Sequence, residues 1–139
     1  MRNLCLLVRV SVLPLVSLSF VAVAGAQQLE LPRPSPLAKV SQMVGLTEVA
    51  VEYSSPAVKG RAIWGGLLPE GKLWRTGANA ATKITFSRDV TVADKPVPAG
   101  SYAIFSIPGK DSFTVILNKN TNQGGTDQYK QELDQARFT

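Results

Sequence analysis

The segment Thr82-Lys-Ile-Thr-Phe-Ser-Arg-Asp-Val-Thr-Val92 has the clearest two-residue periodicity in the chain. Its odd positions are polar, and its even positions are mostly apolar: Ile84, Phe86, Val90 and Val92. Alternation of this kind is typical of a β-strand with one buried face. Arg88 interrupts the apolar series, so a turn or bulge is predicted at residues 87–89.

A second strand signal precedes this segment. Residues 46–53 place Val49, Val51 and Tyr53 on one face of an expected strand. Since Tyr53 shares the apolar face, its ring is expected in the core with its hydroxyl hydrogen-bonded.

Further strands are expected downstream. Residues 101–107 and 112–118 are rich in β-branched and aromatic side chains, and Pro-Gly-Lys-Asp at 108–111 has the composition of a hairpin turn. Residues 93–100 are predicted to be a turn-rich connection. Helical signals are weak, and the best is residues 127–136, a polar stretch long enough for one or two turns.

These strands and turns predict an all-β fold, namely an antiparallel β-sandwich with a jelly-roll-like arrangement. The domain is expected to span residues 40–139. Residues 136–139 resemble the beginning of one more strand, so the domain is expected to be incomplete at its C-terminus, because missing strands would leave apolar side chains and a sheet edge exposed.

The first 26 residues have the pattern of a signal peptide. Arg2 and Arg9 flank a basic start, residues 10–23 are mostly apolar, and Ala24-Gly25-Ala26 provides small residues for cleavage after Ala26. The predicted location is therefore secreted or periplasmic, without a transmembrane anchor after cleavage. Prolines at every second position of 32–36 predict an extended spacer over residues 27–39.

The composition argues against several kinds of site. The chain has no histidine, and Cys5, its one cysteine, lies within the predicted leader. We therefore expect no metal site and no cofactor, and assign no catalytic residue. Without Arg2 and Arg9, 13 of the 15 basic residues remain against 10 acidic ones, a net charge of +3. Because the basic residues form no run, a nucleic-acid partner is not predicted.

Residues 59–79 are predicted to be one long loop with five glycines and both tryptophans. Such loops are usually functional or structured by their own side chains. Trp64 and Trp74 either stack on a ligand or close the open end of the sandwich. Arg75 and Asn79, separated by Gly77, either converge on one ligand group or have a structural role, in which they satisfy carbonyls of the loop or pair with Glu70 or Glu52. The candidate ligand-binding residues are Arg61, Trp64, Trp74, Arg75, Thr76 and Asn79.

Several short motifs occur in an order that resembles a known bacterial family, the domain of unknown function 2911. They are Val40-Ser41-Gln42, the run from Val51 to Arg61, Gly66-Leu67-Leu68-Pro69, Trp74-Arg75-Thr76-Gly77-Ala78-Asn79, Pro98-Ala99-Gly100-Ser101-Tyr102, Ile107-Pro108-Gly109 and the run from Val115 to Lys119. The resemblance implies a secreted or envelope-associated β-rich domain without an assigned activity. It also implies an acidic residue where Ala80 stands, an arginine at Ser55 and an aromatic residue near Gly124, so this chain departs from the pattern at three positions.

Three functions follow as hypotheses. The preferred one is a non-catalytic binding module for a small molecule, glycan or protein partner, with the ligand at the loop of residues 61–79. The alternative is a carboxylate-dependent hydrolase that uses Glu52, Glu70 or Tyr53 near Arg75. The third is a structural envelope or interaction protein with an exposed strand edge that pairs with another chain.

Overall fold

Antiparallel strands account for nearly all of the regular secondary structure in the computed structural model, which describes residues 31–139. The leader predicted at residues 1–26, its cleavage site and the first spacer residues, 27–30, lie outside the described residues. The strands are β1 (Leu37–Val44), β2 (Thr47–Ser54), β3 (Lys83–Phe86), β4 (Val90–Val92), β5 (Lys95–Val97), β6 (Gly100–Pro108), β7 (Phe113–Asn118) and β8 (Asp134–Phe138), with a 3-10 turn, η1, at Gln131–Leu133.

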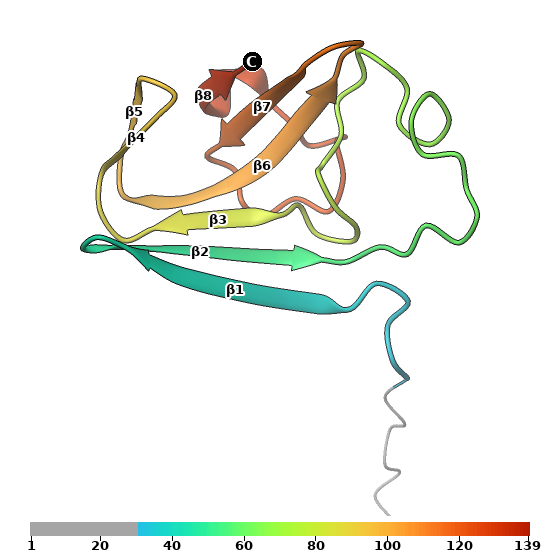
Figure 1. The fold of residues 1–139 in the computed structure, drawn as a ribbon, viewed down its shortest axis with the longest axis horizontal. Helices are drawn as coiled ribbons and strands as arrows, with labels where there is room; N and C mark the ends of the chain where they lie inside the picture. The colour runs from blue at the N-terminus through green and yellow to red at the C-terminus, as the bar shows by residue number, and fades with distance from the viewer. Residues whose placement is uncertain (1–30) are drawn as a thin grey trace, which may run out of the picture. The chain divides into compact units, whose positions relative to one another are not determined.

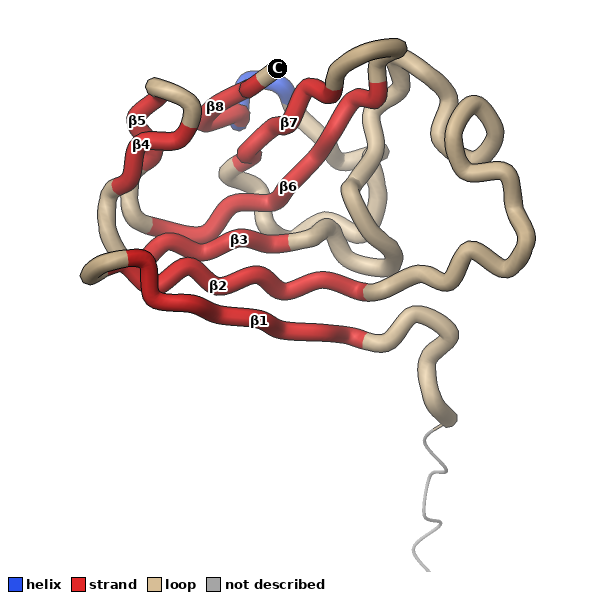
Figure 2. The backbone as a smooth tube through the Cα atoms, viewed as in Figure 1, coloured by secondary structure: helices blue, strands red, loops and turns tan. Residues whose placement is uncertain are grey.

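Six of these strands form one antiparallel sheet in the order β1-β2-β3-β6-β7-β8 (Figure 1). Neighbours in the sheet are consecutive in the chain except at β3 and β6, where the separate two-stranded β4-β5 sheet intervenes. Figure 2 shows that one long loop, between β2 and β3, emerges at one end of the sheet, and that the β4-β5 hairpin lies at the other end. The prediction of an all-β, antiparallel and sandwich-like fold is confirmed.

Two tight turns define the hairpins that flank β3. Gly45 and Leu46 join β1 to β2, and the positive φ of Gly45, 60°, suits a two-residue turn with glycine first. Ala93 and Asp94 join β4 to β5 with φ values of 43° and 62°, the geometry of a type I′ turn. Residues 93–100, predicted to be a connection only, therefore contain the short strand β5.

Other local predictions had mixed outcomes. The interruption predicted at residues 87–89 is confirmed, since β3 ends at Phe86 and β4 begins at Val90. The hairpin turn predicted at residues 108–111 is confirmed between β6 and β7. The weak helical signal of residues 127–136 corresponds to a single 3-10 turn, η1. Asp134 then begins β8, whose residues Ala136 and Phe138 pack against the sheet core.

Side chains of β6 and β7 alternate between the two faces of the sheet, and a core lies on each face. We call one side the hairpin face: its core residues Phe86, Tyr102, Leu117 and Ala136 pack under Val90, Val92 and Val97 of β4 and β5. We call the other side the loop face: Ala103, Phe105 and Ile116 pack under Leu73 of the long loop and Tyr129 of the segment before β8.

The β1 end of the sheet is barely covered. Tyr53 was predicted to be buried, yet 38% of it is exposed, because it follows Glu52, the last residue of β2 that pairs with β3, and the β4-β5 hairpin lies at the other end of the sheet (Figure 2). Strand β1 was not predicted at all and begins at Leu37, within residues expected to be spacer. Its side chains are exposed on both faces, so its sequence needs no apolar alternation. Among residues 31–139, no helix has the length and apolar character needed to span a bilayer.

Candidate functional site

The long loop between β2 and β3 is tied to β6 beyond the first residue of β3, Lys83, which pairs with Ala103. Trp74 and Ser106 exchange two backbone hydrogen bonds of 2.8 Å, and Gly71 donates to the Pro108 carbonyl at 2.7 Å. Trp74 thus occupies the position beside β6 that a longer β3 would have taken. This tie fixes the middle of the loop to the rigid sheet.

The first part of the loop is ordered by its own backbone. Leu67 donates to the Ala62 carbonyl at 3.0 Å, and Leu68 donates to the Ile63 carbonyl at 2.8 Å. A Cβ atom at Gly66 would lie 2.5 Å from the Ala62 carbonyl oxygen, so this close turn requires glycine. These backbone bonds order the first part of the loop, and Trp64 lies at its surface.

An open groove of about 500 Å³ lies along this loop. Its volume falls within the range of small-molecule sites. Its walls are predominantly apolar, with two arginines as their charged members. The residues that line it are Pro56, Ala57, Val58, Arg61, Ile63, Trp64, Leu67, Leu68, Leu73, Trp74, Arg75, Gly77, Ala78 and Thr126.

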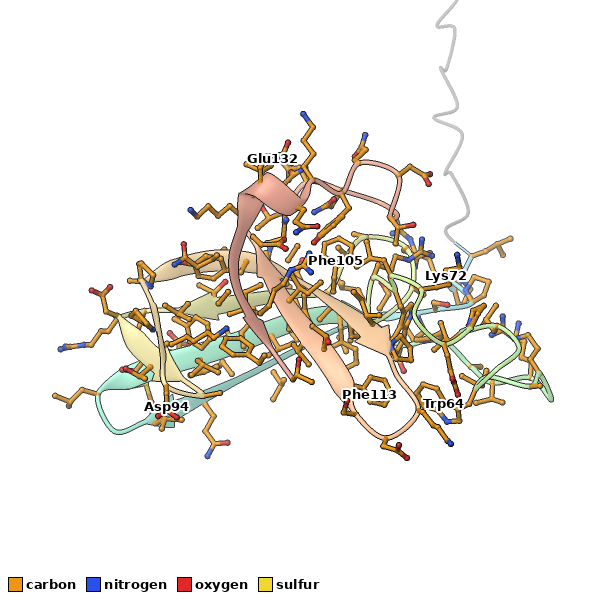
Figure 3. The ribbon with its side chains drawn as sticks, turned by 90° about the horizontal axis from the view of Figure 1, so that it is seen from above. Trp64, Lys72, Asp94, Phe105, Phe113 and Glu132 are labelled. Carbon is orange, nitrogen blue, oxygen red and sulfur yellow. The ribbon has the colours of Figure 1, made fainter. Side chains whose placement is uncertain are left out.

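The two tryptophans both line the groove but differ in burial. Trp64 is 64% exposed, and its ring packs edge to face on Phe113 with a centroid distance of 5.6 Å. Figure 3 shows Trp64 and Phe113 beside each other at the surface, whereas Phe105 lies inside. Trp74 is half-buried where it joins β6. Trp64 therefore presents an aromatic surface to solvent.

Arg61 is held at the groove by the chain that precedes it. Its Nε donates to the Val58 carbonyl at 3.0 Å, and its Nη2 donates to the Ala57 carbonyl at 2.7 Å. These bonds fix the guanidinium plane and leave Nη1 as the nitrogen without a hydrogen bond to residues 31–139.

Arg75 connects the loop to the segment that follows β7. Its Nη1 donates to the Gly124 carbonyl at 3.0 Å, while its Nε is buried without a hydrogen-bond partner among the described residues. An unpaired buried N–H is costly, by about 1–3 kcal/mol. The Arg75 guanidinium is thus oriented by one carbonyl and retains donor capacity at the groove.

Thr76 and Asn79 lie outside the groove lining. The Thr76 hydroxyl is 3.0 Å from Ser106 Oγ, and the Asn79 amide donates to the Ser35 carbonyl at 3.2 Å. Both residues have positive φ, 52° and 58°, and a Cβ atom at Gly77 between them would lie 2.7 Å from Thr82 Oγ1. The structure thus brings together Arg61, Trp64, Trp74 and Arg75, and directs Asn79 away from Arg75 onto another carbonyl.

The hydrolase alternative depends on Glu52, Glu70 or Tyr53, and none of these three residues lines the groove. Glu52 lies on β2, 2.7 Å from Lys39 Nζ and 3.6 Å from Lys83 Nζ. The hydrogen bond from Lys39 lowers the pKa of Glu52, with Lys83 acting in the same direction. A lowered pKa favours the ionised form, so Glu52 is poorly suited to act as a general acid at neutral pH.

A cluster that sequence reasoning missed lies between β7 and β8. Asp134 Oδ2 accepts hydrogen bonds of 2.7 Å from the Tyr129 hydroxyl and from Arg137 Nε, and its Oδ1 accepts one of 2.8 Å from Asn118 Nδ2. Asn118 is fully buried. A polar residue at the end of the apolar run of residues 113–118 was the signal available in the sequence. Its hydrogen bonds are internal, so we assign the cluster to stability.

This cluster predicts a loss of stability in alkali. Burial raises the pKa of Tyr129 above its usual value, and the hydrogen bond to Asp134 raises it further. A group whose pKa is higher in the folded state stabilises the fold below its unfolded pKa, near 10, and this contribution disappears as pH rises through the folded pKa. We expect the free energy of unfolding, measured with urea, to fall above about pH 10.

Tyr129→Phe should make this fall shallower, by at most about 1.4 kcal/mol per pH unit. Tyr102 contributes in the same direction, since burial and, to a smaller extent, Asp89 raise its pKa. Tyr102→Phe is therefore the variant to compare with Tyr129→Phe. The two substitutions together should give the smallest fall of the unfolding free energy with pH. An unchanged profile in Tyr129→Phe would contradict the assignment.

Comparison with curated proteins and with solved structures found no match. A family model described as a protein of unknown function (DUF2911) matches residues 35–139. The matched span contains β1 to β8 and every residue of the groove wall. The resemblance drawn from the short motifs is confirmed, and the chain belongs to the DUF2911 family.

Proposed function

We propose that this protein is a secreted, non-catalytic binding module whose groove takes up a small molecule with an apolar body and an anionic group. The observation that carries the proposal is the pair Arg61 and Arg75 on an otherwise apolar wall. Neither arginine forms an ion pair with an acidic residue among residues 31–139. A carboxylate or phosphate is the group that a guanidinium binds best.

The apolar part of the ligand would rest on the remaining wall. Trp64 offers an exposed ring, and Leu67 is also exposed, at 53%. Covering such side chains contributes about 25 cal/mol for each Å² of apolar surface removed from water. A neutral glycan fits this wall less well, because none of the residues that line it has an amide or carboxylate side chain to bind sugar hydroxyls.

The proposed location outside the cytoplasm rests on the sequence. The leader pattern of residues 1–26 supports export, and the chain after Ala26 has no cysteine that would respond to an oxidising compartment.

Tryptophan fluorescence tests the groove directly, because the chain has two tryptophans and both line it. We expect octanoate to change the emission saturably and octanol to bind more weakly, since only octanoate carries a charge. Arg75→Met should weaken octanoate binding about tenfold or more, the effect of losing a charge-assisted hydrogen bond.

Arg88→Met is the matched control, because it removes the same charge from an exposed residue outside the groove wall. It should leave octanoate binding unchanged. The proposal fails if no anionic probe gives a saturable signal, or if Arg75→Met and Arg61→Met both bind octanoate as the parent chain does.

A further inference from the structure

Strand β1 is an outer strand of the sheet, and Figure 2 shows no other strand beside its outer side. Which of its backbone groups face outward follows from one bond: Ser55 donates to the Pro36 carbonyl at 2.9 Å. In antiparallel pairs, backbone groups alternate between the two sides of a strand. The even residues of β1 therefore bond to β2, and Leu37, Lys39, Ser41 and Met43 direct their N–H and C=O groups outward.

Sheet edges of this kind are usually protected by prolines, bulges, charges or covering segments. None of these protects β1 within residues 31–139. Its pairing with β2 runs without a bulge from Leu37 to Val44, and no proline interrupts it. Lys39, its one charged residue, is paired with Glu52 on the sheet face at 2.7 Å.

The opposite edge strand, β8, is protected. Lys95 of β5 donates from Nζ to the Arg137 carbonyl at 2.6 Å and lies 6.0 Å from the Phe138 ring centroid. Lys95 thus caps an outward carbonyl of this edge. Of the two edge strands, only β1 has both free backbone groups and exposed apolar side chains within residues 31–139. These side chains are those of Leu37, Val40, Met43 and Val44.

We propose that two copies of this chain associate through β1, paired antiparallel to itself about a two-fold axis at Val40. This register pairs all four outward residues, because Leu37 meets Met43 and Lys39 meets Ser41 of the second copy. Val40 then faces itself at the close, non-hydrogen-bonded position. An axis at Ser41 would instead place Leu37 opposite Gly45, in the turn.

The sequence of β1 suits a second copy as the partner. No charged side chain lies directly opposite a like charge in this register, and Lys39 keeps its own Glu52. The apolar residues that are exposed in one chain lie against apolar residues of the other, as in Leu37 with Met43. Joining the edges also satisfies the outward backbone groups with protein partners, as strand addition does in other complexes.

Sedimentation velocity over a dilution series tests the association in the full chain carrying Cys5→Ser. We expect a concentration-dependent dimer. Ser41→Pro removes an outward N–H while leaving the bonds from β1 to β2 in place, so it should abolish the dimer. Ser41→Ala is the matched control and should retain it.

Two further variants keep the test decisive if Ser41→Pro fails to fold, which circular dichroism would reveal. Val40→Lys places two like charges opposite each other and should also abolish the dimer. Val40→Cys should form an intermolecular disulfide under mild oxidation, whereas Thr91→Cys on exposed β4 should not. A monomer at every concentration, a dimer that survives both Pro and Lys substitutions, or equal cross-linking at Thr91 would overturn the proposal.

Discussion

Phe105→Ala should lower the free energy of unfolding by about 3–5 kcal/mol. Phe105 is fully buried on the loop face, and its ring lies 5.1 Å from that of Tyr129. Truncation removes the apolar surface of the ring and leaves a cavity between β6 and the segment that carries Tyr129. Since small domains have about 5–15 kcal/mol of stability in total, this single change should remove a large share of it.

Urea denaturation followed by circular dichroism measures this effect. Phe113→Ala is the matched control, because the same side chain on the neighbouring strand β7 is 42% exposed. Phe113→Ala should lower the free energy of unfolding distinctly less than Phe105→Ala does. Equal costs for the two variants would show that Phe105 is not the main support of the loop face.

Asp134→Ala should lower the free energy of unfolding by about 1–3 kcal/mol, the cost of leaving buried hydrogen-bond donors without an acceptor. The Asp134 side chain is only 8% exposed, and it accepts bonds from Asn118, Tyr129 and Arg137. Its loss leaves the Arg137 guanidinium without a carboxylate. Unpaired donors at a buried position cost more than the pair itself contributes.

Denaturation of two companion variants separates this cause from a loss of packing. Asp134→Asn keeps the shape and should cost less than Asp134→Ala. Combining Asp134→Leu with Arg137→Met removes the charge together with its partner and should recover part of the stability. If the double variant were less stable than Asp134→Ala, the unpaired charge would not be the cause.

The loop illustrates how far the candidate site can be predicted. The density of glycine, tryptophan and arginine in residues 59–79 singled out the loop, and four of the six candidate residues line one groove there. The apolar wall residues Val58, Ile63, Leu67, Leu68 and Leu73 were not singled out, because a loop has no periodicity that assigns its side chains to a wall. Thr126 could not be found at all, since it reaches the groove only through the segment after β7.

The sequence by itself determined the strands whose two faces meet different environments. In residues 82–92, the apolar side chains of β3 and β4 contribute to the hairpin-face core, and their polar neighbours do not. The residue types therefore alternate, and the alternation can be recognised in the sequence. Tertiary structure alone decided the rest. Strand β1 is exposed on both faces and carries no such pattern. The carbonyls that Arg75 and Asn79 bind are 49 and 44 residues away in the sequence, so only the folded chain brings them within hydrogen-bond distance.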